Sequence, residues 1–166
     1  MSWSRRRVLA LAVPGMAVLP LAGCFKPMLA EDSAASGLRG QIALPEIVDR
    51  FDYHLVQSLE SRLGRPDATA YRLDVQTSIS EQALAVTQDN SVTRVTLTAT
   101  AEWALYRDGD TSPVLTGRAN TQSGYNATGS LYATRQTRRD IERRLARDLG
   151  ERISRIVLAR ADRVTA

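Results

Sequence analysis

Alternation of apolar and polar residues dominates the middle of the chain. It runs through residues 71–79, 92–107 and 114–126, where a period of two predicts strands with one buried and one solvated face. The first of these strands is expected to continue over residues 83–87 after a bend. The separating turns are expected at residues 89–91 and 108–110. Consecutive strands joined by short turns predict an antiparallel meander.

Two other stretches repeat their apolar residues every three or four positions, which predicts amphipathic helices. The first covers residues 46–63, begins after Pro45, carries Asp49 in its first turns and ends before Gly64. Its apolar face is expected to consist of Ile47, Val48, Phe51, Leu55, Leu59 and Leu63. The second helix covers about residues 130–160, with an apolar stripe formed by Ile141, Leu145, Leu149, Ile153 and Ile156.

Two residues disturb the pattern of the second helix. Gly150 costs a helix interior roughly 1 kcal/mol relative to alanine, so a kink is expected there. Arg138 lies on the line of the apolar stripe, three residues before Ile141. Either the helix leaves the core at Arg138, or the arginine extends its charged end past the edge of the core.

A short strand over residues 38–44 precedes these elements, so the order is strand, helix, three strands and helix. Each helix and the sheet has one apolar face to bury. The expected fold class is therefore α+β, a two-layer sandwich. A mainly antiparallel sheet of about four strands is packed by two helices, of which the C-terminal one is long. The single domain is expected to span residues 38–166.

The N-terminal segment has the organisation of a bacterial secretion signal. Three arginines precede an uncharged, mainly apolar stretch, residues 8–22, which is too short to span a bilayer stably. Leu21-Ala22-Gly23-Cys24 then resembles a lipobox. Residues 1–23 are therefore expected to be removed, and Cys24 is expected to carry lipid. Residues 24–37 are expected to form the lipidated tether.

The residue after the lipobox bears on the membrane in which the protein resides. Phe25 follows Cys24, whereas aspartate at that position would suggest retention in the inner membrane. The expected location is therefore the periplasmic face of the outer membrane, with the protein held there by its lipid anchor. The arginine run also resembles a twin-arginine signal, so two export routes stay open.

Composition agrees with one globular domain, because 24% of the 166 residues are charged and 43% are apolar. The formal net charge of +4 depends on the leader: without residues 1–23, 19 basic residues face 18 acidic ones. A mature charge close to zero argues against a nucleic-acid partner. The single cysteine and the single histidine exclude an internal disulfide and any site that needs two imidazoles.

No arrangement of residues typical of catalysis stands out. His54 lies beside Tyr53, off the apolar stripe of the first helix, and is expected at the surface. A lipidated Cys24 leaves no thiol nucleophile, and the motifs Gly-x-Ser-x-Gly, Gly-x-Gly-x-x-Gly and His-Glu-x-x-His are absent. The chain is therefore expected to be non-enzymatic and to need neither a cofactor nor a metal.

Three arginines are the candidate binding residues. Arg72, Arg94 and Arg118 fall on the polar side of the predicted strands. Guanidinium groups suit phosphate because they offer two parallel hydrogen bonds. The alternative is a solvated sheet face on which these arginines form ion pairs. Tyr125 and Tyr132 present a similar choice, between burial and contact with a partner.

Several short motifs along the chain occur together in one known family. They are Cys24 with Phe25-Lys26-Pro27-Met28-Leu29, Asp49-Arg50 with the leucines of the first helix, Asp89-Asn90-Ser91 with Arg94, Ser123-x-Tyr125-Asn126, and Ser130-x-Tyr132-Ala133-Thr134. The long arginine-rich helix completes the set. With these motifs the chain resembles the LptE family of lipopolysaccharide-assembly lipoproteins over nearly its whole length.

This resemblance implies a function without covalent chemistry. A protein of this family would plug an LptD-type outer-membrane β-barrel, help the barrel assemble and assist the transport of lipopolysaccharide to the outer leaflet. Arg94, Arg118 and Arg72 would then meet the phosphates of lipid A. The alternative is a lipoprotein accessory subunit of a phospholipid-transport ABC system, whose partner would be an inner-membrane permease. A lipid-anchored hydrolase is disfavoured, because catalytic residues are lacking.

Overall fold

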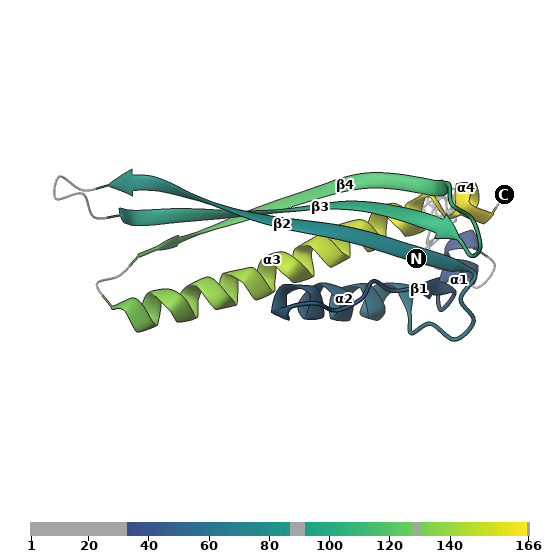
Figure 1. Ribbon diagram of the computed structural model, residues 1–166, viewed down its shortest axis with the longest axis horizontal. Helices are drawn as coiled ribbons and strands as arrows, with labels where there is room; N and C mark the ends of the chain where they lie inside the picture. Colours follow the sequence, from purple (N-terminus) through teal and green to yellow (C-terminus); the bar gives the residue numbers. More distant parts are fainter. Residues whose placement is uncertain (1–32, 87–91, 128–129, 166) are drawn as a thin grey trace, which may run out of the picture.

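The computed structural model describes residues 33–86, 92–127 and 130–165. The elements are α1 (Ala34–Leu38), β1 (Ile42–Ala43), α2 (Arg50–Leu63), β2 (Tyr71–Val86), β3 (Val92–Arg107), β4 (Pro113–Asn126), α3 (Leu131–Ala159) and α4 (Ala161–Thr165). Figure 1 shows an elongated domain in which the sheet forms one layer and α2 and α3 form the other. The leader, Cys24 and the turn expected at residues 89–91 lie outside the described residues.

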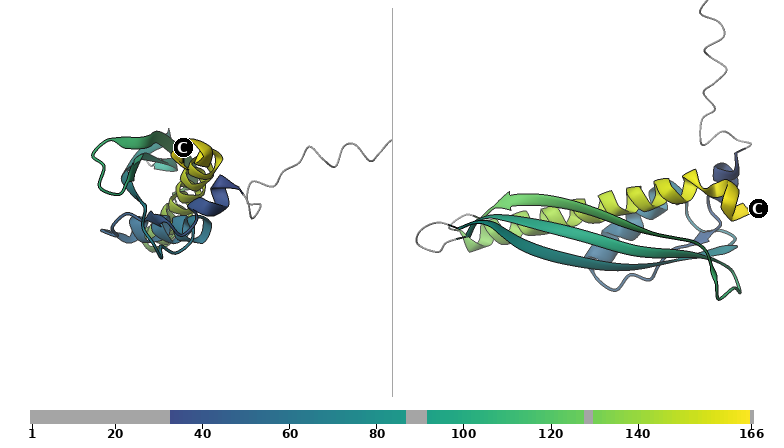
Figure 2. Two further views of the ribbon diagram at one scale, coloured as in Figure 1. Left: turned by 90° about the vertical axis from the view of Figure 1, so that its right-hand side faces the viewer. Right: turned by 90° about the horizontal axis from the view of Figure 1, so that it is seen from above.

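The sheet confirms the expected fold class, a two-layer α+β sandwich. Its strand order is β1-β2-β3-β4, and β2, β3 and β4 form the antiparallel meander. β1 pairs in parallel with the start of β2, because α2 lies between the two strands and carries the chain back to the same end of the sheet. Both main helices lie on one face of the sheet, as the end-on view shows (Figure 2).

One face of the sheet is buried beneath these helices. Odd-numbered side chains of β2 and β3 point into the core, where Leu73, Leu97 and Leu105 are fully buried. The helices contribute Leu55, Leu59, Leu63, Leu145, Leu149, Ile153 and Val157. Trp103 stands opposite Gly117 of β4, where an added methyl group would overlap the indole ring. The absence of a side chain at Gly117 therefore makes room for the indole of Trp103.

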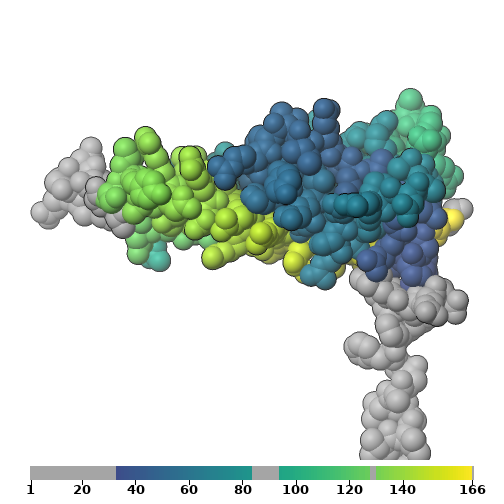
Figure 3. Space-filling model, turned by 90° about the horizontal axis from the view of Figure 1, so that it is seen from below, coloured from purple at the N-terminus to yellow at the C-terminus, as the bar shows by residue number. Residues whose placement is uncertain are grey.

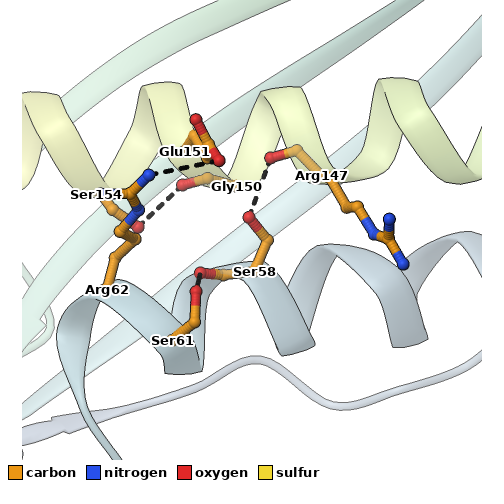
Figure 4. A network of polar contacts seen from close by, with 7 residues as sticks. All are labelled: Ser58, Ser61, Arg62, Arg147, Gly150, Glu151 and Ser154. Atoms are coloured by element: carbon orange, nitrogen blue, oxygen red, sulfur yellow. Dashed lines mark hydrogen bonds and ion pairs between the residues drawn. The ribbon is translucent and has the colours of Figure 1, made fainter.

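The two main helices lie very close together at Gly150. A Cβ atom there would lie 2.7 Å from Cβ of Ser58 and 2.9 Å from the carbonyl oxygen of Leu55, closer than real Cβ contacts. The Ser58 hydroxyl donates to the carbonyl oxygen of Arg147 at 2.8 Å, and Ser154 donates to that of Gly150 at 2.7 Å (Figure 4). Gly150 is therefore a contact position, and α3 continues through it as one helix without the expected kink (Figure 1).

α2 begins later than the sequence pattern indicates. The side chain of Asp49 accepts a hydrogen bond from the backbone N–H of Asp52 at 2.8 Å, so Asp49 is the N-cap and not a first-turn residue. Ile47 and Val48 consequently lie outside the helix and are exposed, and the prediction that they belong to its apolar face is wrong. Gly64, with a φ of 85°, follows the last helical residue as expected.

The end of the domain that carries the two short helices is more folded than expected. The sequence interpretation gave residues 34–37 to the tether and residues 38–44 to a strand. Instead α1 occupies this stretch, buries Ala35 and Leu38, and leaves only two residues to β1. α1 contacts α4, beside the C-terminus (Figure 2). Periodicity does not reveal either helix, because five residues are too few to show a helical repeat.

The helical layer does not cover the whole sheet. The 14 residues of α2 span roughly 21 Å, whereas the 16 residues of β2 span roughly 53 Å. Residues 78–83 of β2 are consequently exposed on both faces, including Ile79. The first turns of α3 likewise extend beyond α2 in the space-filling view (Figure 3). We call residues 78–83 and 131–139, at this uncovered end, the distal end of the domain.

We expect Gly150→Ala to destabilise the protein by roughly 1–3 kcal/mol, because the added methyl group forces α2 and α3 apart. Helix propensity alone would predict the opposite, a gain of about 1 kcal/mol. The free energy of unfolding in urea distinguishes the two. Gly37→Ala is the matched control. Outside its own helix and chain neighbours, no atom of the described residues lies within 4 Å of its Cβ position, so stability should be equal or higher. Unchanged stability of Gly150→Ala would contradict the close approach.

Candidate functional site

The outward face of the sheet carries the three candidate arginines. Arg72, Arg94 and Arg118 are all exposed and stand on the side opposite the helices, as their positions in the strand pattern predict. Threonine, serine, asparagine and glutamine make up much of the rest of this face. The face is therefore solvated and offers hydroxyl, amide and guanidinium groups to a ligand.

The structure does not bring these arginines together into one site. Arg72 stands opposite Tyr106, and Arg118 stands opposite Glu102. Arg94 lies near the start of β3, at the distal end of the sheet. The step along β3 from Arg94 to Glu102 is eight residues, or roughly 27 Å. The three arginines therefore form a row along the sheet, not a pocket.

Each arginine has a different electrostatic setting. The Arg72 guanidinium pairs with Asp74 at 3.1 Å, and Arg118 lies 3.7 Å from Glu102. No ion pair involves Arg94 within the part of the chain that the structure describes. The predicted ion-pair alternative therefore holds for Arg72 and Arg118, while the charge of Arg94 is the least compensated of the three.

A shallow hollow of about 420 Å³ opens on this face between β2, β3 and β4. The carboxylates of Asp74 and Glu102 line it together with the guanidinium of Arg118 and the ring of Tyr106. Arg72 lies over the same ring, 4.9 Å from its centre. Because two carboxylates share the hollow with one guanidinium, it does not favour a lone anion.

Beyond the buried core, a polar cluster joins α3 to the sheet. Arg138 pairs with Glu81 of β2 at 3.1 Å and with Glu142 at 3.0 Å. The first buried residue of α3 is Ile141, so the helix leaves the core at Arg138, yet the arginine still reaches the sheet. Both predictions for Arg138 therefore hold in part, because the helix leaves the core there and the arginine extends past the edge of the core to Glu81. The negative charge of Glu81 also acts on Tyr125: burial, together with this charge, raises the pKa of Tyr125 above its usual value.

The two tyrosines singled out in the sequence have different surroundings. Tyr125 is 8% exposed and belongs to the core, whereas Tyr132 is 79% exposed. Leu131 beside it is 64% exposed. These two large side chains, in the first turn of α3, lie at the distal end where no second helix covers them. They are available for contact with another molecule.

A cationic cluster between α2 and α3 could not be read from the sequence. A small cavity of about 100 Å³ is lined by Arg50, Phe51, His54, Arg139, Glu142 and Arg143. The Nδ1 atom of His54 is buried, and no described group forms a hydrogen bond with it. Burial and the guanidinium charges of Arg147, Arg143 and Arg50 lower the pKa of His54. His54 is thus half-buried between cations and not on the open surface.

The only sequence signal for this cluster is local spacing. Arg50 and His54 are one helical turn apart, as are Arg139 and Arg143, so each pair shares a helix face. Nothing in that spacing tells that the two faces meet. The meeting depends on the packing of α2 against α3.

The described residues offer neither a cluster of metal ligands nor a membrane-spanning helix. No group of three His, Cys, Asp or Glu side chains in the described ranges could hold a metal ion. None of the helices in those ranges is long and apolar enough to cross a membrane. Cys24, the expected lipidation site, falls outside them.

Comparison with known proteins gives one family and several structures. The profile of the LptE family, described as lipopolysaccharide-assembly, matches residues 39–155. A protein of Caulobacter crescentus CB15 described as a lipoprotein has 25% identity and a TM-score of 0.59, and the match covers 76% of this chain and 93% of that one. Among proteins with curated descriptions, none matches this sequence significantly.

Two more distant structures share the fold. The minor lipoprotein of Acinetobacter baumannii has 18% identity and a TM-score of 0.56, with 71% of this chain and 88% of that one covered. Rare lipoprotein B of Shewanella oneidensis has 12% identity and a TM-score of 0.61, with 76% and 99% covered. At these identities the likeness concerns the fold alone.

We expect the imidazole of His54 to titrate below its ordinary pKa of 6.5, because burial and nearby guanidinium groups disfavour its charged form. The unfolded chain would take up this proton at a higher pH. His54 therefore contributes stability above pH 6.5 that is lost as the pH falls through the lowered native pKa. NMR titration of the ring protons measures this pKa directly, since the chain has one histidine.

Arg143→Gln should move the pKa of His54 back toward its ordinary value, because it removes one of the opposing charges. Arg144→Gln, on the same helix but outside the cavity lining, is the charge-matched control and should leave the titration unchanged. A native pKa at or above the ordinary value in the parent protein would be the contrary result.

Proposed function

Because this chain belongs to the LptE family of lipopolysaccharide-assembly proteins, we propose that it plugs an LptD-type β-barrel of the outer membrane. It helps that barrel assemble and assists the transport of lipopolysaccharide to the outer leaflet. The observation that carries the proposal is the family match over residues 39–155, which takes in the sheet, α2 and most of α3. In this role the protein binds and plugs the barrel, without catalysis.

The surface chemistry of the domain supports a barrel interior as its place. The lumen of a transmembrane barrel is polar, whereas its lipid-facing side is apolar. The outward sheet face is made of hydroxyl, amide and charged groups, and exposed arginines line α3. Such a surface keeps its hydration in a water-filled lumen. The elongated outline of the domain also suits a narrow space (Figure 1).

A lipid anchor at Cys24 would hold the protein on the periplasmic face of the outer membrane. Residues 1–23 would be removed as the signal peptide, which leaves Cys24 at the N-terminus. The nine steps from Cys24 to Ser33 reach at most about 31 Å. The end of the domain that carries α1 and α4 would therefore stay near the membrane, with the distal end pointing away from the anchor.

The row of arginines on the outward sheet face is our proposed contact for the phosphates of lipid A. Arg94, Arg118 and Arg72 follow one another along the strands and present successive cations to an anionic lipid. Arg94 is the strongest of the three candidates, since its charge has no ion-pair partner among the described residues.

We expect the full chain, tagged at its C-terminus and extracted from membranes in mild detergent, to co-purify with an LptD-type barrel in equal amounts. Mass spectrometry of the purified material identifies the partner. Cys24→Ala is the control for the anchor: it should release the chain from the outer-membrane fraction when it is made without its barrel. Co-purification of an inner-membrane permease would contradict the proposal and favour a phospholipid-transport accessory role.

We expect Arg94→Ala to weaken the binding of purified lipopolysaccharide more than Arg118→Ala does, because Glu102 offsets the charge of Arg118. Loss of a charge-assisted hydrogen bond corresponds to roughly ten- to hundredfold weaker binding. Arg155→Ala, an exposed arginine of α3, controls for net charge. If the double variant Arg94→Ala, Arg118→Ala stays folded by circular dichroism and binds as tightly as the parent, the assignment is wrong.

A further inference from the structure

We propose that the cavity between α2 and α3 binds a phosphate group. We call it the α2–α3 pocket, lined by Arg50, Phe51, His54, Arg139, Glu142 and Arg143. It lies on the helical side of the domain, away from the outward sheet face, and does not depend on the proposed barrel or lipopolysaccharide contacts. Its volume of about 100 Å³ leaves room for an ion of the size of phosphate.

Two guanidinium groups in the lining are not neutralised. Neither Arg50 nor Arg139 forms an ion pair within residues 33–86, 92–127 and 130–165. Arg50 comes from the first turn of α2 and Arg139 from the N-terminal half of α3, so the cations belong to different helices. Packing of the helices holds both at one small cavity, where an anion interacts more strongly than in bulk water.

The carboxylate of the pocket lining and the carboxylate that pairs with Arg143 are already engaged. Glu142, which lines the pocket, receives a hydrogen bond from Arg138 at 3.0 Å. Asp140 binds Arg143 at 3.0 Å. Neither carboxylate cancels the two unpaired guanidinium groups. A phosphate dianion would supply the missing negative charge and accept parallel hydrogen bonds from the planar guanidinium groups.

One residue of the lining, His54, carries a buried nitrogen atom, Nδ1, without a hydrogen-bond partner among the described residues. Buried polar atoms are rarely left in that state. Protonated Nδ1 can donate to a phosphate oxygen, and the anion would offset the guanidinium charges that now disfavour the imidazolium form. Bound phosphate is therefore expected to raise the pKa of His54.

A phosphate group can reach the pocket as the free ion or as the headgroup of a lipid. To distinguish these sources, the full chain in dodecyl maltoside is titrated with inorganic phosphate and, separately, with dihexanoyl phosphatidic acid, at constant ionic strength. The NMR signals of the single histidine report occupancy in both titrations. A saturable shift with phosphate alone indicates a free-ion site, and a shift with the lipid indicates headgroup binding. The absence of a saturable shift with either titrant overturns the proposal.

Single substitutions locate the binding in the pocket. Arg50→Gln and Arg139→Gln should each weaken binding about tenfold or more, because each removes a charge-assisted hydrogen bond. Both side chains are exposed and lack ion pairs within the described ranges, so the fold should survive, which circular dichroism checks. Arg144→Gln is the charge-matched control on α3. If Arg144→Gln weakens phosphate binding as much as Arg139→Gln does, the anion is attracted to the basic helix in general, and the proposal is overturned.

A variant of the sheet separates this site from the proposed lipopolysaccharide contacts. Arg94→Ala removes a cation on the opposite face and should leave phosphate binding at the α2–α3 pocket unchanged. The same set of variants therefore distinguishes a protein that binds lipopolysaccharide but no phosphate at the pocket from one that binds phosphate but no lipopolysaccharide. Phosphate binding that is lost in Arg94→Ala but kept in Arg139→Gln would assign the ion to the sheet face and contradict the pocket.

Discussion

The close contact of α2 and α3 at Gly150 sets the geometry on which the rest of the domain depends. With no side chain at this position, Ser58 and the backbone at Leu55 can lie directly against α3. The Ser58 hydroxyl completes the contact through its hydrogen bond to the carbonyl of Arg147. Two helices held at this distance present one continuous apolar layer to the sheet. The same approach brings their charged faces together, which creates the α2–α3 pocket.

This packing also determines where the core stops. α2 is much shorter than the strands, so α3 alone reaches the distal end. There the apolar contacts give way to the ion pairs of Arg138 with Glu81 and Glu142. Exposed ion pairs typically contribute less than about 1 kcal/mol each. The distal end is thus the less firmly held part of the domain, and it is also where Tyr132 is most open to contact.

The candidate binding residues were predictable in part. Strand periodicity placed Arg72, Arg94 and Arg118 on one solvated face, because side chains two residues apart point the same way in any strand. Periodicity could not tell how far apart they lie or which carboxylates pair with them, since both depend on the register between strands. The cluster around His54 was not predictable, because its arginines come from helices separated by the whole meander.

Local patterns in the sequence were enough to predict the three long strands, the two main helices and the two-layer α+β arrangement, and the short motifs pointed to the LptE family. These features follow from backbone periods and turn residues, which are local. Three features emerge only in the folded domain: Gly150 serves a helix contact, Arg138 bridges to the sheet, and α1 and α4 close one end of the domain. Each of these depends on distances between segments remote in the chain, and such distances come from the packing of the whole core, which no local pattern encodes.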